Sequence, residues 1–133
     1  GLGRPEWLTQ AARAWRVVPV ASPRRRALTP IWRKPWMAIG SDTFTGALLA
    51  RLGYDGVLAD SPERYPRFGL DDVALLAPDL VVLPDEPYAF GPDDGPECFA
   101  PIPSSCVSGR LLTWYGPSLL EAAEVLPQAL TLP

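Results

Sequence analysis

A run of four consecutive apolar residues, Leu80–Leu83, limits the folds open to this chain more than any other segment. Two of the four are valines, which favour extended backbone. A strand that is apolar at every position is buried on both faces, and this is typical of a parallel sheet that helices cover on each side. The rest of the chain is therefore expected to supply helices for two faces of one sheet.

Apolar residues at helical spacing occur before and after this run. Ser41 or Asp42 is the expected cap of the clearest helix, in which Phe44, Ala47, Leu48 and Leu52 repeat and Gly53 is the stop. The other predicted helices are Pro5–Val18, Leu70–Ala77 with Leu70, Val73, Leu76 and Ala77 inward, a short helix that Pro92 opens over Asp93–Phe99, and a closing helix that Ser118 caps.

Short apolar runs between these helices predict the other strands. Pro30 lies inside the first of them, which predicts an edge position or a bulge there. The strands are expected at Ala27–Trp32, at Val57–Ala59, at Leu80–Leu83, and around Cys106–Val107, continuing through Gly109 and Leu112. One helix followed by four strand–helix units predicts an α/β protein, a three-layer α/β/α sandwich with a mostly parallel central sheet and right-handed crossovers.

Composition narrows the classes of function. The chain has 133 residues, enough for one core, and its net charge of −3 argues against a nucleic-acid footprint. Arg24–Arg26 is the only basic run and is interpreted as part of a solvated linker, Pro19–Arg26. The sequence contains no histidine, the commonest general base and transition-metal ligand, so no metal site is predicted. Cys98 and Cys106 fit no metal or redox spacing, and whether they pair stays open.

Four loops at the expected carboxyl ends of strands carry aromatic rings and charges. In the first, Trp32 and Trp36 flank Arg33, Lys34 and Pro35, and the proline excludes helix interior and central strand. The other three are Arg64–Pro66, Asp85–Tyr88 and Trp114–Tyr115. Such loops are where ligands bind in open α/β sheets, and rings with a few charges suit a large, flat, partly polar ligand. The alternative is that the tryptophans are ordinary core residues.

Several of these segments, with others along the chain, resemble the C-terminal lobe of the helical-backbone substrate-binding proteins of ABC importers for cobalamin and ferric siderophores. The matching strings are Ile31-Trp32-Arg33, Pro35-Trp36, Gly40, Asp42-Thr43-Phe44, Leu52-Gly53, Arg64-Tyr65-Pro66, Asp79-Leu80-Val81, Leu83-Pro84-Asp85-Glu86-Pro87-Tyr88 and Gly109–Pro117.

The resemblance implies one lobe of a two-lobed, non-enzymatic receptor. Residues 1–25 would be the end of the inter-lobe helix with a linker, and 26–133 the C-terminal lobe. The ligand would be cobalamin or a ferric siderophore, held without any cofactor against an N-terminal lobe that this chain lacks. The partners would be that lobe, or a second chain, and an ABC permease. The location would be extracytoplasmic, periplasmic or at the cell surface, with the cytoplasm not excluded.

The resemblance also assigns roles to residues. Tyr65 falls where the family places an aromatic ring against the corrinoid, and Asp71 falls at or next to an acidic residue that docks on the permease. An acid in the first turn of a helix is also stabilising by itself, so both readings of Asp71 stay open. The expected ligand-binding residues are Trp32, Arg33, Trp36, Arg64, Tyr65, Asp85, Glu86, Tyr88 and Trp114. The alternative role of Asp85 and Glu86 is to close a turn. The alternative role of Tyr88 and Trp114 is packing inside the protein.

Two other classes of function are weighed against the receptor. In the first, the chain is a single-lobe interaction module that dimerises or binds a partner protein through the aromatic rim and an uncovered Trp7–Trp15 helix face. In the second, Asp85 and Glu86 act as paired catalytic carboxylates. Adjacent residues in an extended loop point apart, and no histidine assists them, so the enzyme is the weakest hypothesis.

Overall fold

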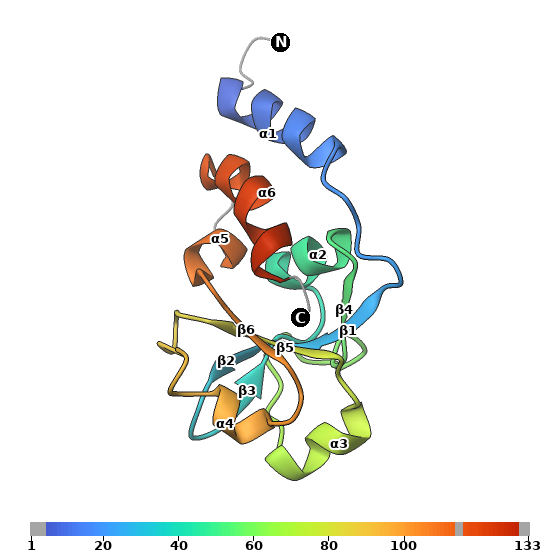
Figure 1. Cartoon of the computed structure of the whole chain (residues 1–133), viewed down its shortest axis with the longest axis vertical. Helices are drawn as coiled ribbons and strands as arrows, with labels where there is room; N and C mark the ends of the chain where they lie inside the picture. The colour runs from blue at the N-terminus through green and yellow to red at the C-terminus, as the bar shows by residue number, and fades with distance from the viewer. Residues whose placement is uncertain (1–4, 114–115, 131–133) are drawn as a thin grey trace.

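The computed structural model describes residues 5–113 and 116–130 and has three layers (Figure 1). The middle layer is a four-stranded sheet in the order β4-β1-β5-β6, and each neighbouring pair of strands is parallel. Its strands are β1 (Arg25–Leu28), β4 (Tyr54–Gly56), β5 (Leu80–Pro84) and β6 (Ser104–Val107). The predicted α/β/α sandwich with a mostly parallel sheet is confirmed.

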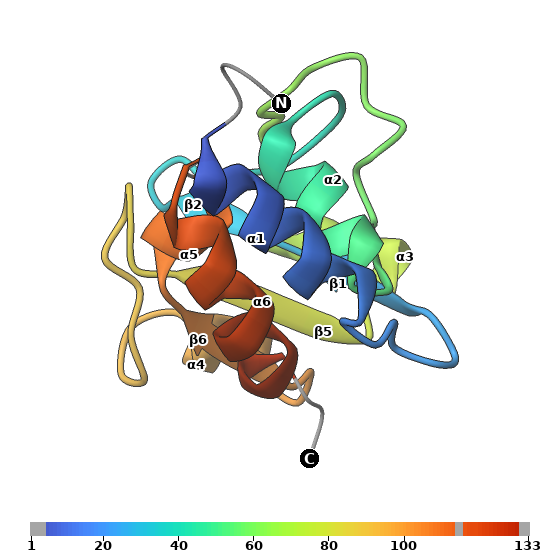
Figure 2. The ribbon, with the colours of Figure 1, turned by 90° about the horizontal axis from the view of Figure 1, so that it is seen from above.

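Helices lie on both faces of the sheet. The face toward the top of Figure 1, here called the upper face, is covered by α2 (Phe44–Arg51), α5 (Gly109–Thr113) and α6 (Ser118–Ala129), and α1 (Glu6–Arg16) packs outside them (Figures 1 and 2). The lower face carries the 3₁₀ turn η1 (Leu70–Asp72), α3 (Val73–Leu76), α4 (Pro96–Phe99) and a two-stranded antiparallel hairpin of β2 (Pro30–Trp32) and β3 (Met37–Ala38).

Strand β5 explains why both faces need a cover. Its five residues are all buried, and successive side chains point to opposite faces. Leu80 and Val82 join the upper core with Leu112 and Leu126, whereas Val81 and Leu83 join the lower core. The prediction from Leu80–Leu83 of a strand buried on both sides is thus confirmed.

Helix α1 packs on the domain. Ala11 is 2% exposed, and Trp7 and Trp15 pack against the upper core. The indole Nε1 of Trp15 donates a hydrogen bond to the carbonyl of Leu119 at 2.9 Å. The expectation that this helix leaves its tryptophan face uncovered is therefore wrong, because α6 supplies the cover. The predicted boundary after residue 25 falls inside β1, although the division into helix end and lobe stays a prediction.

The first predicted strand is two strands in different sheets. β1 ends at Leu28, and β2 pairs with β3, not with the central sheet. Pro30 explains the break, because it has no N–H for a ladder on a central strand. The loop at Trp32–Trp36 is consequently the tip of a hairpin and not a strand-to-helix connection.

Other boundaries differ in ways that have local causes. β4 lies at Tyr54–Gly56, three residues before the predicted Val57–Ala59, because it pairs with β1 directly after Gly53. The chain does not extend from β6 through Gly109 to Leu112; it forms helix α5 there. The cap of α2 is Thr43, whose hydroxyl accepts from the N–H of Gly46 at 2.9 Å, and not Ser41 or Asp42.

Three expectations on other helices also need correction. Pro96, not Pro92, opens α4. Ser118 begins α6 without capping it, because Pro117 holds the cap position. In η1 and α3 only Val73 is buried, whereas Leu70 is 40% exposed and Ala77 is exposed.

The basic run is not a solvated linker. Arg25 and Arg26 belong to β1. Arg24 forms an ion pair with Asp55 at 2.8 Å, and the guanidinium of Arg26 donates to the carbonyl of Leu76 at 2.7 Å. Within residues 5–113 and 116–130, no helix is long and apolar enough to cross a membrane.

Candidate functional site

The sheet topology marks one place for a ligand. From β1 the chain moves to β4 on one side, and from β5 it moves to β6 on the other, although β1 and β5 are neighbours. The strand order therefore reverses between β1 and β5. In open α/β sheets the crevice outside the carboxyl ends of the strands at such a switch point is where ligands bind.

A hollow of about 240 Å³ opens at this point. It draws residues from the segments that follow β1, β4, β5 and β6. Of the four predicted loops, Arg64–Pro66 and Asp85–Tyr88 contribute to it through Tyr65 and Pro87, whereas Trp32–Trp36 does not and Trp114–Tyr115 lies outside the described residues. We call it the rim hollow. Its lining residues are Ile31, Ile39, Thr43, Phe44, Thr45, Tyr65, Pro87 and Thr113.

Tyr65 is held at the rim hollow by backbone contacts between two loops. The N–H of Gly40 donates to the carbonyl of Arg64 at 2.7 Å, and the N–H of Ala38 donates to that of Pro66 at 3.0 Å. Gly40 allows this approach, since a Cβ atom there would lie 2.3 Å from the carbonyl oxygen of Glu63. The ring of Tyr65 remains 48% exposed. A rigid backbone thus presents a half-exposed aromatic ring beside the switch point.

Trp32, Trp36 and Tyr88 do not line the rim hollow. Trp32 is 42% exposed and meets the ring of Tyr88 edge-on, with centroids 5.6 Å apart. The ring of Tyr88 in turn lies 4.5 Å from Phe90, which is buried in the lower core. Trp32 and Tyr88 therefore form an aromatic pair at the tip of the β2–β3 hairpin, apart from the residues that line the rim hollow.

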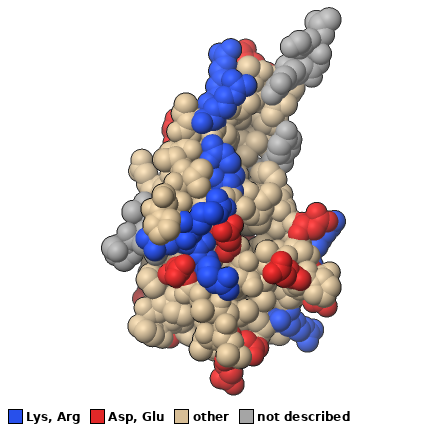
Figure 3. All heavy atoms as spheres, turned by 90° about the vertical axis from the view of Figure 1, so that its right-hand side faces the viewer, with Lys and Arg blue, Asp and Glu red and all other residues tan. Residues whose placement is uncertain are grey.

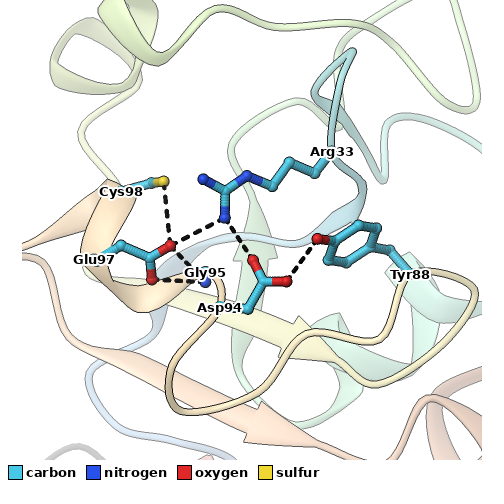
Figure 4. Close-up of polar contacts among 6 residues, drawn as sticks. All are labelled: Arg33, Tyr88, Asp94, Gly95, Glu97 and Cys98. Carbon is cyan, nitrogen blue, oxygen red and sulfur yellow. Dashed lines mark hydrogen bonds and ion pairs between the residues drawn. The ribbon is translucent and has the colours of Figure 1, made fainter.

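Arg33, Tyr88, Asp94 and Glu97 form a network that we call the Arg33 cluster (Figure 4). The guanidinium of Arg33 contacts Asp94 at 2.5 Å and Glu97 at 3.0 Å, and the hydroxyl of Tyr88 donates to Asp94 at 2.6 Å. The N–H of Gly95 donates to both carboxylate oxygens of Glu97. These contacts fasten the tip of the β2–β3 hairpin to the segment between β5 and α4.

The contacts in this cluster shift several pKa values. Backbone N–H donors at Glu97 itself and Gly95, together with Arg33, lower the pKa of Glu97. The hydrogen bond to Asp94 is the first cause of a raised pKa at Tyr88. Burial raises the pKa of the Cys98 thiol, whose Sγ lies 3.7 Å from Glu97, and also that of Cys106. Both cysteines are free thiols, and neither carries an activating shift.

Trp36 packs inside the molecule. Its ring lies parallel to Phe90 with centroids 6.0 Å apart and edge-on to Phe99 at 5.2 Å, and the guanidinium carbon of Arg33 lies 5.2 Å from its centroid. It belongs to the partly buried residues of the lower core. The core alternative weighed for the tryptophans therefore describes Trp36, whereas Trp32 stays accessible.

The remaining charged residues of the predicted site are separate from one another. Arg64 forms an exposed ion pair with Asp42 at 3.1 Å. The carboxylate of Asp85 accepts from the N–H of Gly109 at 2.8 Å, which joins the end of β5 to the start of α5. Glu86 is exposed and accepts no hydrogen bond from the described part of the chain. Asp85 is thus held by the backbone while Glu86 faces solvent, so the two adjacent carboxylates are not arranged as a pair.

Two predicted residues lie away from this region or outside the description. Asp71 is exposed in η1, on the lower side of the sheet. Trp114 lies outside the described residues. Across residues 5–113 and 116–130, no group of His, Cys, Asp and Glu side chains is arranged to hold a metal ion.

The apolar lining of the rim hollow was not predicted as a site. Ile31, Phe44 and Pro87 contribute to it, and Phe44 is 37% exposed although it belongs to the apolar repeat that predicts its helix. The available signal was position, because each of these residues comes shortly after a strand or opens the helix that follows one. The prediction selected residues by aromatic rings and charges, and it therefore named their neighbours instead.

No protein-family model and no curated protein sequence matches the chain. Solved structures do share its fold. BhuT, a periplasmic heme-binding protein in complex with two hemes, aligns with a TM-score of 0.75 and 18% identity over 93% of this chain and 53% of its own. For the periplasmic vitamin B12-binding protein BtuF of Vibrio cholerae the TM-score is 0.68, with 15% identity over 94% of this chain and 49% of its own.

A third solved structure, from an ABC-type Fe³⁺-hydroxamate transport system of Saccharomonospora viridis, aligns with a TM-score of 0.71 and 19% identity. It covers 93% of this chain and 48% of its own length. The chain therefore spans about half the length of these proteins and has the fold of that half. The resemblance predicted from the sequence, to one lobe of such a protein, is confirmed at the level of the fold.

Proposed function

We propose that this chain is one lobe of the substrate-binding component of an ABC importer, and that its rim hollow forms one wall of the site for a large, flat chelate. Corrinoids, hemes and ferric siderophores belong to this class. The observation that supports it is the position of the half-exposed Tyr65 ring and the apolar hollow at the topological switch point. The fold neighbours include proteins described as binding heme, vitamin B12 and Fe³⁺-hydroxamate.

The size of the hollow fits a wall better than a complete site. Small-molecule pockets that enclose their ligand are about 300–1,000 Å³, and the rim hollow, at about 240 Å³, is below that range. A second surface, on another lobe or another chain, would complete the enclosure. In this arrangement the lobe contributes stacking and apolar contact, and it performs no covalent chemistry.

The lower side of the sheet offers a surface for a permease. Asp71 is exposed there, Leu70 is 40% exposed, and Leu75 in α3 is 87% exposed. An acidic residue beside exposed leucines is the kind of mixed patch that a protein partner covers. We include Asp71 in the proposed docking surface, and the location of the protein would then be extracytoplasmic.

Equilibrium titration tests the ligand proposal. Hemin, cobalamin and a ferric hydroxamate are added separately to the chain, and tryptophan fluorescence and ligand absorbance are followed. At least one chelate is expected to bind saturably. Loss of the stacking ring in Tyr65→Ala is expected to weaken that binding by about tenfold, which corresponds to roughly 1.4 kcal/mol, whereas Tyr65→Phe retains most of it.

Leu75→Ala is the matched control, because it removes an exposed apolar side chain on the lower side of the sheet. Its affinity is expected to equal that of the unmodified chain. If none of the three chelates binds, or if Tyr65→Ala and Leu75→Ala behave alike, the proposal fails.

The alternative of a dimerising or partner-binding module has less support. The uncovered tryptophan face of α1 no longer supports such a module, since Trp7 and Trp15 both pack on the upper core. Trp32 and Tyr65 remain as exposed rings that a second protein could cover. Sedimentation at several concentrations decides, because self-association through these rings would raise the sedimentation coefficient with concentration.

A further inference from the structure

A second pocket, of about 290 Å³, lies at the opposite end of the sheet from the rim hollow. It opens at the amino ends of β1 and β4, where Arg25 and Tyr54 are partners in register. We call it the Arg25 pocket. It is lined by Pro19, Val20, Ala21, Ser22, Arg25, Leu52, Tyr54 and Pro127.

The backbone around this pocket is fixed. The N–H of Ala21 donates to the carbonyl of Leu52 at 2.9 Å, and the N–H of Arg25 donates to that of Gly53 at 2.9 Å. Gly53 has a φ of +97°, and a Cβ atom there would lie 2.6 Å from the nitrogen of Ala21. A side chain at this position would therefore displace the segment that forms one wall, and glycine keeps the pocket's shape.

Strand alternation separates Arg25 from Arg26. Arg26 donates to carbonyls at the end of α3, whereas Arg25 points to the face on which Ala27 joins the upper core, and it lines the pocket. Arg24 precedes β1; it is paired with Asp55 and donates to the carbonyl of Ala50. Within the described part of the chain, Arg25 has no ion pair and no side-chain hydrogen bond, and it is only partly exposed.

The charge of Arg25 acts on its surroundings. Burial raises the pKa of Tyr54, and the positive charge of Arg25 opposes that increase. The hydroxyl of Tyr54 donates to the carbonyl of Leu130 at 2.9 Å, so its hydrogen is already used. Figure 3 shows Lys and Arg side chains in a band down the face that carries the connection from α1 to β1. This connection supplies Val20, Ala21 and Ser22 to the pocket, and the same face carries acidic side chains among the basic ones.

A guanidinium that is partly removed from water and lacks a counter-ion attracts an anion. Its planar donors match the two oxygens of a carboxylate, and the hydroxyl of Ser22 is a further donor at the same pocket. Val20, Leu52 and Pro127 supply apolar walls. A cavity of about 150 Å³ can hold benzene, so the pocket, at about 290 Å³, accommodates a molecule with one small ring or a short chain and is too small for a chelate of heme size.

We propose that the Arg25 pocket binds a small carboxylate with an apolar body, with Arg25 on the carboxylate and Val20, Leu52 and Pro127 on the body. The site is independent of the rim hollow, because the two lie at opposite ends of the strands. Binding there needs no chelate, and the proposal stands or falls separately from the transport function.

The test uses benzoate and its neutral analogue benzamide in two-dimensional amide NMR of the whole chain. Benzoate is expected to shift the amide signals of Ala21, Ser22, Arg25 and Tyr54 saturably. Benzamide at the same concentration is expected to leave them in place, because it lacks the charge that Arg25 pairs with. Phenyl phosphate forms a third arm, and tighter binding than benzoate at the same amides would assign the site to phosphate-bearing ligands.

Two variants give the control. Arg25→Gln is expected to weaken benzoate binding by about tenfold or more, whereas Arg13→Gln, which removes an exposed positive charge from α1, is expected to change it less than about twofold. Equal losses in the two variants would indicate general attraction to a positive face and would overturn the site. Shifts with benzamide equal to those with benzoate, or no shifts with benzoate at about 10 mM, would overturn it even if Arg25→Gln failed to fold.

Discussion

The Arg33 cluster and the rim hollow are neighbouring regions that use similar residues in opposite ways. In the Arg33 cluster each charge has an internal partner, and the adjacent Trp36 is packed among Phe90 and Phe99. At the rim hollow, Tyr65 is 48% exposed beside apolar side chains. The first region stabilises the hairpin, and the second leaves surface for a ligand.

The difference shows what decides whether a ring beside a charge is structural. Arg33 finds its carboxylates 61 and 64 residues away in sequence, and once paired it covers the ring of Trp36. Among the described residues the ring of Tyr65 has no such partner, although its loop is held by backbone hydrogen bonds and by the ion pair of Arg64 with Asp42. The paired guanidinium of Arg33 lies over the ring of Trp36, which also packs on Phe90, whereas the ion pair beside Tyr65 leaves that ring half-exposed. The rings that pack against it, and not the pairing of a nearby charge, therefore decide whether a ring is structural.

Trp36→Ala tests the structural role of the ring beside Arg33 and is expected to change stability more than any other substitution proposed below. Removal of a packed tryptophan ring from the lower core is expected to lower the free energy of unfolding by about 3–5 kcal/mol. Trp32→Ala, which removes an exposed ring from the same hairpin, is expected to cost less than about 1 kcal/mol. Chemical denaturation measures both, and equal costs would show that the two rings do not differ in role.

Gly40→Ala tests the backbone contact that presents Tyr65. The added methyl group meets the carbonyl of Glu63, so the loop must move, at an expected cost of about 1–3 kcal/mol in unfolding free energy. Chelate affinity is expected to fall as well, since Tyr65 moves with the loop. The matched control is Gly91→Ala, because nothing lies within 4 Å of a Cβ atom at Gly91. A stable Gly40→Ala protein with unchanged affinity would contradict the role given to this contact.

Asp85→Ala separates a structural carboxylate from a ligand-binding one. The change leaves the N–H of Gly109 without its partner. The free energy of unfolding is therefore expected to fall by about 1 kcal/mol. Asp85→Asn keeps an acceptor oxygen and is expected to recover most of it. Chelate affinity, measured by the same titration as for Tyr65, is expected to be unchanged in both variants, and a selective loss of affinity would return Asp85 to the site.

Glu97→Gln is expected to have the smallest effect, and this effect is a change in how stability depends on pH. The pKa of Glu97 in the folded protein is below its ordinary value of 4.5. The stability that the ionised Glu97 carboxylate contributes is therefore present above pH 4.5, and it is lost as the pH falls through the lower pKa of the folded protein. Melting temperatures of the two proteins are expected to converge as the pH is lowered below 4.5. Asp55, whose pKa Arg24 lowers, is present in both proteins and cancels in the difference.

Local sequence predicted the parts of the fold that local rules determine. The uninterrupted apolar run gave β5, and the glycine at position 53, with a φ of +97°, ends α2 where expected. The hairpin could not be placed in the same way. Pro30 indicated an irregularity, but β2 pairs with β3 in a separate sheet, and Arg33 at the tip of this hairpin contacts Asp94, which lies 61 residues away in sequence.

The candidate site was predicted as a region and not residue by residue. The strand order places the loops after β1 and β5 together, and alternating strands and helices were enough to indicate that edge of the sheet. Which rings face outward depends on long-range pairing, so Tyr65 and Trp36 could not be separated from sequence. The apolar lining at Ile31, Phe44 and Pro87 carries no charge or unusual pattern and could be recognised only from coordinates.

Paramagnetic broadening tests most directly whether the rim hollow is the ligand surface. A ferric hydroxamate is added to the ¹⁵N-labelled chain, and amide signals are compared with those in the presence of its diamagnetic gallium analogue. The signals of Ile31, Ile39, Thr45 and Tyr65 are expected to broaden, while those of Ala21 and Ser22, at the other end of the sheet, stay sharp. Broadening that spares the rim hollow, or that spreads evenly over the molecule, would contradict this assignment.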